Sequence, residues 1–160
     1  IELTEEGERI GRAVVRRHRI IETYLAKSLG MPWDQVHDEA DRLEHAASEA
    51  LVERMDEALG HPDADPHGDP IPRDHDPSRS GVVLMSSVAA GTDVQVVRVS
   101  DANPDILRFL AERGIAIGTR LRVLSRLSGA GLMTVGLLET EVELSAPVAE
   151  AVHVKPVKPS

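Results

Sequence analysis

The most informative absence in this 160-residue sequence is that of cysteine. Without a thiol, the chain can hold neither a disulfide framework nor a metal bound by thiolates. Aromatic residues make up only 2% of the chain, as Tyr24, Trp33 and Phe109. Any hydrophobic core must therefore be aliphatic, and the length allows one or two small domains. The lack of cysteine also fits a protein of the reducing cytoplasm.

Long apolar runs and an excess of positive charge are lacking as well. No stretch approaches the roughly 20 apolar residues that a membrane-spanning helix needs, and no signal peptide is visible, so we expect no membrane partner. The net charge of −9 argues against a chain that grips nucleic acid, because such binding depends on clustered Lys and Arg. The sequence starts at Ile1, and "IEL" is typical of the end of a strand, so we expect an N-terminal part to be missing.

Three helices are expected in residues 1–60. Thr4, followed by two glutamates, is a typical helix N-cap, and Gly30 is a typical C-terminal stop. The segment "MPWDQ" is expected to start a second helix with Pro32 in its first turn, and Ser48 to cap a third helix that stops at Gly60. Apolar residues at helical spacing predict the packing faces: Ile10, Val14, Ile21 and Leu25 in the first helix, and Val36, Ala40, Leu43 and Ala47 in the second.

The rest of the chain changes in character. Residues 61–81 are rich in proline and poor in aliphatic residues, which predicts a linker or an extended segment on a surface. After them, "TDVQVVRVS", "TRLRVLSRL", "LMTVGLL" and "TEVELS" alternate apolar and polar residues as strands do. One helix, "NPDILRFLAERG", is expected between them, capped by Asn103 and stopped by Gly114. The predicted fold class is α+β, with a helical domain at 1–60, a Pro-rich linker at 61–81 and a small β-barrel with one inserted helix at 82–157.

Side chains that can bind metal lie within the predicted helices. In the second helix they occupy one side of the apolar stripe, within an arc of about 100°: His37, Asp41, Glu44 and His45. The first helix repeats the arrangement with His18 and Glu22, which lie one turn apart. Imidazole and carboxylate donors suit Mn²⁺, Fe²⁺, Zn²⁺, Co²⁺ or Ni²⁺, and a carboxylate-rich set favours Mn²⁺ or Fe²⁺. No nucleophile or separate base stands out, so we expect no catalytic residues.

A simpler interpretation exists for each of these residues. His18 and Glu22 are also typical of an exposed helix pair, and the set on the second helix of a solvated polar face. The histidines of the predicted linker are most simply solvated: His61, His67 and His75. Arg17 falls inside the apolar stripe of the first helix, so we expect it to extend to solvent or to find a carboxylate.

Three stretches give the sequence a resemblance to a known family: "LTEEGERIGRAVVRRHRIIETYL", "VHDEADRLEHAASEALVERM" and "DPHGDPIP". They resemble the diphtheria toxin repressor family of metal-dependent transcriptional regulators, and within it the manganese transport regulators. The segment "GTDVQVVRVSDANPDILRFLAERGIAIGTRLRVL" looks like the SH3-like domain that this family shares with ferrous-iron transport protein A. The resemblance implies a winged-helix DNA-binding domain, then a helical metal-binding and dimerisation domain, then the SH3-like domain. The first of these is expected to be missing here.

The resemblance also implies two metal sites. The primary site of the family matches Asp41, Glu44 and His45, completed by donors from the missing domain, and the ancillary site matches His18, Glu22 and His37. At the place of Asp41, iron-responsive members have cysteine and manganese-responsive members typically have glutamate, so the resemblance favours Mn²⁺, with Fe²⁺ as the alternative.

Three functions follow as hypotheses. The first is the metal-sensing and dimerisation portion of a manganese-dependent repressor, alternatively an iron-responsive one, in which bound metal favours the operator-binding homodimer. Operator DNA would be bound through the missing domain and not through this chain. The second is a metal-storage or metal-dependent enzyme domain, which we do not favour. The third is a dimerisation and interaction module without sensing, in which the SH3-like domain binds a peptide or the chain's own linker.

Overall fold

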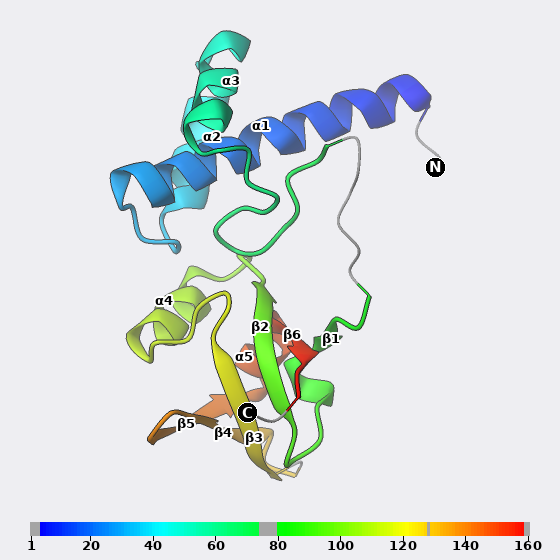
Figure 1. Ribbon diagram of the computed structural model, residues 1–160, viewed down its shortest axis with the longest axis vertical. Coiled ribbons are helices and arrows are strands. Elements are labelled where there is room, and N and C mark those ends of the chain that lie inside the picture. Colours follow the sequence, from blue (N-terminus) through cyan, green and yellow to red (C-terminus); the bar gives the residue numbers. More distant parts are fainter. Residues whose placement is uncertain (1–3, 74–79, 128, 159–160) are drawn as a thin grey trace. The chain divides into compact units, whose positions relative to one another are not determined.

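The computed structural model describes residues 4–73, 80–127 and 129–158. The chain forms two compact units, Ile1–Ser78 and Arg79–Ser160. The first is helical, with α1 (Glu5–Leu29), α2 (Val36–Glu44) and α3 (Glu49–Ala58). The second is built on an antiparallel sheet, so the predicted α+β class is confirmed (Figure 1).

The helix ends follow the capping residues that the sequence predicts. Thr4 accepts a hydrogen bond from the Gly7 amide at 3.1 Å, and Ser48 accepts one from the Leu51 amide at 3.2 Å. Gly30 ends α1 with φ 67°, a conformation in which glycine carries no Cβ penalty. The expected start of the second helix is wrong by one turn, because Pro32 begins a separate turn that the Gln35 amide closes, and α2 begins at Val36.

The core of the first unit is aliphatic, as expected from the scarcity of aromatic residues. It consists of Ile20, Ile21, Leu25, Val36, Ala40, Val52 and Ile71. Two predicted core positions at the start of α1 are instead half exposed, Ile10 at 50% and Val14 at 51%, and Leu43 on α2 is 36% exposed. The buried cluster therefore engages only the second half of α1, and apolar surface is left uncovered on the helices.

The segment after α3 is part of the first unit and is partly buried against its helices. Ile71 is 1% exposed and His67 is 0% exposed, so the expectation of a solvated His67 is wrong. Backbone hydrogen bonds close the segment on itself, from Asp65 to Asp69 and from Ile71 to Asp63, both 2.9 Å long. Compact hydrogen bonding satisfies the polar backbone and lets a proline-rich sequence be buried. His75, another histidine of the predicted linker, lies outside the described residues.

Arginines of α1 hold this segment in place. Arg12 donates to the Arg73 carbonyl at 2.7 Å, and Arg19 donates to the Pro70 carbonyl. Arg16 and Arg73 both donate to Asp56 of α3, at 3.0 and 2.7 Å, and Asp56 is 1% exposed. Charged hydrogen bonds therefore stabilise the helical unit in addition to its hydrophobic core.

The second unit has six strands in the order β1-β6-β2-β3-β4-β5. The predicted alternating segments form β2 (Asp93–Val99), β3 (Arg120–Leu127), β4 (Leu132–Leu137) and β5 (Thr140–Ser145). The expected helix is α4 (Pro104–Glu112), and Asn103 caps it by accepting from the Asp105 amide at 3.0 Å. The remaining elements were not predicted: β1 (Val83–Leu84), the 3-10 helix η1 (Met85–Ser87), α5 (Ala146–Ala151) and β6 (Val152–Pro156).

The β4–β5 hairpin carries an unusual tip. Leu138 is fully exposed there and has φ 53°, which is uncommon for a residue with a side chain. Among the described residues, no helix combines the length and the apolar character needed to cross a membrane.

Candidate metal centre

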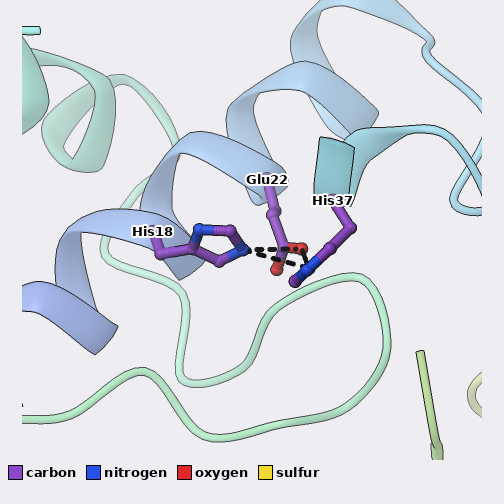
Figure 2. A group of neighbouring side chains, drawn as sticks. All are labelled: His18, Glu22 and His37. Atoms are coloured by element: carbon purple, nitrogen blue, oxygen red, sulfur yellow. Dashed lines mark hydrogen bonds and ion pairs between the residues drawn. The ribbon is translucent and has the colours of Figure 1, made fainter. Parts of the chain in front are cut away.

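A first group of side chains converges on Glu22. Glu22 Oε1 lies 3.1 Å from His18 Nε2 and 3.1 Å from His37 Nδ1. The two imidazole rings meet edge to face, with centroids 4.8 Å apart. Figure 2 shows both rings pointing toward the one carboxylate, His18 and Glu22 from α1 and His37 from α2. The one-turn spacing on α1 and the packing of α2 against it create this arrangement.

A second group lies on the other side of the His18 ring. His18 Nδ1 is 2.9 Å from Glu44 Oε2 and 3.4 Å from Asp41 Oδ1. Asp41 is more exposed than the rest, with 57% of its side chain accessible, whereas the value for Glu44 is 15%. His18 therefore connects the two groups through its two ring nitrogens.

The carboxylates around His18 change its pKa, and His18 in turn changes the pKa of Glu22. The hydrogen bond to Glu22 and the nearby carboxylates outweigh partial burial and raise the pKa of His18 to about 9. Burial opposes the ionisation of Glu22, which is 1% exposed, but the hydrogen bond and charge from His18 and the hydrogen bond from His37 keep its pKa below the ordinary value. At neutral pH the metal-free centre thus holds the His18 imidazolium against the ionised carboxylate of Glu22.

A third group was not predicted from the sequence. Glu22 belongs to it as well, together with Asp65 and His67, and all three are buried. Glu22 Oε2 lies 4.0 Å from His67 Nδ1. Burial and the charge of Glu22 raise the pKa of Asp65 to about 6. The motif "DPHGDPIP" was the available signal, but its proline content favoured a solvated linker.

His67 is held in one tautomer by the backbone. Its Nε2 lies 2.7 Å from the carbonyl oxygen of Trp33, which can only accept, so Nε2 carries the hydrogen. Its Nδ1 is buried and has no hydrogen-bond partner among the described residues. A buried lone pair without a partner is costly, and a metal ion is one partner to which it can donate. With the carboxylates of Glu22 and Asp65 beside it, this nitrogen makes the third group a donor set that suits a metal ion.

Five of the six predicted ligands lie together in the first two groups, and His45 lies at their edge. His45 is the C-cap residue of α2, with 84% of its side chain exposed and its Nε2 3.7 Å from Glu44 Oε1. His18, with a 16% exposed side chain, is not the solvated helix residue of the simpler interpretation. Arg17 finds a carboxylate as expected, Glu49 at 2.7 Å.

The geometry suits a hard divalent ion. Within each group the ligand atoms lie within 4.8 Å of one another. Opposite ligands of an ion with bonds of about 2.0–2.4 Å lie about 4.0–4.8 Å apart, so small movements bring each group into bonding range. Carboxylate oxygens and imidazole nitrogens, without thiolate, favour Mn²⁺ or Fe²⁺ over softer metals.

Comparison with known proteins finds a matching domain family for each of the two units. Residues 4–73 match the family model described as iron dependent repressor, metal binding and dimerisation domain, and residues 83–156 match the FeoA domain. The chain is 31% identical over 170 residues to the iron-dependent repressor IdeR of Mycobacterium tuberculosis, covering 98% of this chain and 74% of that protein. It is 29% identical to the diphtheria toxin repressor of Corynebacterium efficiens, over 98% of this chain and 72% of that one.

Solved structures agree with this placement. A manganese-dependent transcriptional repressor in complex with manganese has a TM-score of 0.90 at 43% identity, covering 98% of this chain and 75% of that chain. The structure of ScaR with bound Zn²⁺ has a TM-score of 0.81 at 30% identity, over 98% of this chain and 78% of that one.

Proposed function

Because this chain belongs to the diphtheria toxin repressor family of metal-dependent transcriptional regulators, we propose that it is the metal-sensing and dimerisation portion of a manganese-dependent repressor. The observation that carries this proposal is the sharing of one buried carboxylate, Glu22, by two imidazoles from different helices at 3.1 Å. Such a centre binds an ion only when α1 and α2 hold one particular arrangement, which is the property that a sensor needs.

We propose two sets of ligands. His18, Glu22 and His37 would hold one ion, and Asp41, Glu44 and His45 another. In the structure Asp41 and Glu44 form a group with His18 and not with His45. A neutral imidazole offers one lone pair, so His18 would be a donor to one of the two ions and not to both. The side chains of His45 and Asp41 are 84% and 57% exposed, which gives both room to rotate toward an ion.

Manganese is the proposed ion, and iron is the alternative. The oxygen-rich donor set and the manganese-bound repressor of similar structure favour Mn²⁺. The relatives named iron-dependent repressors support Fe²⁺. Competition between Mn²⁺ and anaerobic Fe²⁺ for the same sites would separate the two, and stronger retention of Fe²⁺ at cellular concentrations would reverse our choice.

Metal binding would act through a shift between two arrangements of a dimer. The ion would join α1 to α2 and replace the proton on His18, favouring the arrangement that binds the operator. The half-exposed apolar residues Ile10, Val14 and Leu51 provide surface for a second copy. With its net charge of −9, this chain is not expected to hold DNA itself, so operator contact would fall to a winged-helix domain. The proposed role is regulatory rather than catalytic, and belongs in the cytoplasm.

Calorimetric titration of the chain with Mn²⁺ tests the proposal. Glu22→Gln keeps the shape of the side chain but removes its charge, and should weaken Mn²⁺ binding by more than about tenfold because a charged ligand is lost. The matched control is Glu57→Gln on α3, an exposed glutamate paired only loosely with Arg54 at 3.8 Å. Binding that is unchanged in Glu22→Gln, or operator binding by the complete regulator that ignores Mn²⁺, would refute the proposed function.

A further inference from the structure

Arg19 lies beside the third group of ligands, on the helix that supplies Glu22. Its Nε is 3.6 Å from Asp65 Oδ2, and its Nη2 is 3.8 Å from Asp69 Oδ1. We propose that Arg19 is a positioning residue that serves as an internal counter-cation for Asp65 and lowers the affinity of the group Glu22, Asp65 and His67 for a divalent ion. This inference rests on the proposed metal-sensing function.

The two oxygens of Asp65 have different surroundings. Oδ1 accepts hydrogen bonds from the His67 and Asp69 amides, at 2.8 and 2.9 Å, and so fixes the turn of the segment. Oδ2 is left to face cations, and it is the oxygen that Arg19 approaches. An ion bound by Asp65 must therefore share this oxygen with the guanidinium or take it over.

Arg19 cannot simply move away. Its Nη1 donates to the carbonyl of Pro70, which anchors the guanidinium to the same segment that carries Asp65 and His67. The side chain is 25% exposed, so solvent screens its charge only in part. A guanidinium stays protonated at all physiological pH values. It therefore remains a permanent positive charge next to the place where the ion would sit.

The arrangement has two opposing effects. In the metal-free protein, Arg19 offsets the repulsion between buried carboxylates, because Asp65 lies close to Glu22 on one side and to Asp69 on the other. When an ion arrives, the same charge repels it and withdraws an oxygen donor. The third group therefore binds an ion with lower affinity than its three donors would have without Arg19.

The only tryptophan of the chain provides a direct readout of this group. The Trp33 ring is stacked on the His67 ring, with centroids 6.1 Å apart and planes 22° apart. Mn²⁺ is paramagnetic, so an ion bound at His67 should quench Trp33 fluorescence. Glu22 belongs to the first group as well, so an ion held there also quenches Trp33. The signal of the third group is therefore the part of the quenching that His67→Ala removes.

The test is a Mn²⁺ titration of the full chain followed by Trp33 fluorescence. Arg19→Met should lower the Mn²⁺ concentration for half-quenching by about tenfold or more, equal to ~1.4 kcal/mol or more, and Arg19→Gln should do the same. Arg19→Lys keeps the charge and should stay within about twofold of the wild type. Arg12→Met is the matched control, since Arg12 holds the same segment at Arg73, and it should leave the midpoint unchanged.

Each other outcome overturns the inference. An unchanged or higher midpoint in Arg19→Met shows that its charge does not oppose the ion. An equal gain in Arg12→Met shows that loosening of the segment, and not charge, is responsible. A gain that persists when Arg19→Met is combined with Asp65→Asn shows that Asp65 is not the residue through which Arg19 acts. If the quenching of Trp33 is the same in His67→Ala as in the wild type, while calorimetry still detects binding that Glu22→Gln removes, this inference fails and the proposed function stands.

Discussion

At the scale of single residues, His18 determines how the centre responds to its surroundings. Both ring nitrogens face carboxylates, Nε2 toward Glu22 and Nδ1 toward Glu44. With a pKa raised to about 9, mainly by the hydrogen bond to Glu22, the ring carries a proton at neutral pH. A metal ion that uses a nitrogen of His18 must displace that proton, so metal binding and protonation compete.

We therefore predict that Mn²⁺ affinity rises with pH. His18 must lose its proton below pH 9, so the apparent affinity should increase about tenfold per pH unit between pH 7 and 8 when one proton leaves per ion. Calorimetry in buffers with different ionisation enthalpies would measure that proton. The control is His153→Gln in the second unit, which should leave the proton count unchanged. An affinity that is flat between pH 7 and 8 would contradict the displacement.

The sequence was sufficient to predict some of these residues and not others. Helical spacing placed His18 and Glu22 on one face of a helix. Their grouping with His37 of another helix came from the resemblance to the family, and the structure brings the three together. Asp65 and His67 could not be predicted, because their burial depends on contacts with α1 that are distant in sequence. The half exposure of Ile10 was missed for the same reason, since periodicity predicts a face but not what covers it.

At the scale of secondary-structure elements, Asp56 links three parts of the helical unit. It sits on α3 and accepts hydrogen bonds from Arg16 of α1, from Arg73, and from His61 at 3.0 Å. Burial raises the pKa of Asp56, but these partners lower it by more, so the pKa lies below its ordinary value. Its contribution to stability is therefore present above the pKa of the unfolded chain and is lost as the pH falls through the lower folded value.

Asp56→Ala should destabilise the first unit by about 3–5 kcal/mol, because it leaves two partly buried arginines without their shared carboxylate. Urea unfolding followed by circular dichroism would measure the loss. Glu57→Ala, the neighbouring exposed glutamate, should change stability by less than about 0.5 kcal/mol. Equal effects of the two substitutions would show that the Asp56 network does not stabilise the fold.

Element boundaries were predictable where a local signal marks them. Thr4, Ser48 and Asn103 each cap the helix that they were expected to start, because capping depends only on nearby backbone amides. The two-residue β1 forms by pairing with β6, Val83 opposite Val154, and β6 lies between β1 and β2 in the sheet. The sequence of β1 is too short to show alternation, so only the assembled sheet identifies it. The alternation in β6, Val-His-Val-Lys, was a signal that the sequence analysis missed.

At the scale of the whole molecule, each of the two units has its own buried core. All the proposed ligands lie in the first unit. A ligand that binds only the folded state stabilises the unit that holds it, by about 2.7 kcal/mol at one hundred times its dissociation constant.

We therefore predict two transitions in differential scanning calorimetry, of which Mn²⁺ shifts only one. For a unit of this size, the stabilisation corresponds to an increase of about 10 °C or more in Tm. Mg²⁺ at the same concentration serves as the control, since it retains its hydration shell more strongly and should have a smaller effect. A parallel shift of both transitions would instead indicate that the second unit supplies a ligand.

The exposed tip of the β4–β5 hairpin has a practical consequence. Leu138 contacts solvent over its whole side chain, and the chain has no natural thiol. Leu138→Cys would therefore carry the sole attachment point for a nitroxide. In an assembled pair of subunits, two such probes would report by pulsed dipolar spectroscopy how their separation changes when a diamagnetic ion such as Zn²⁺ is added.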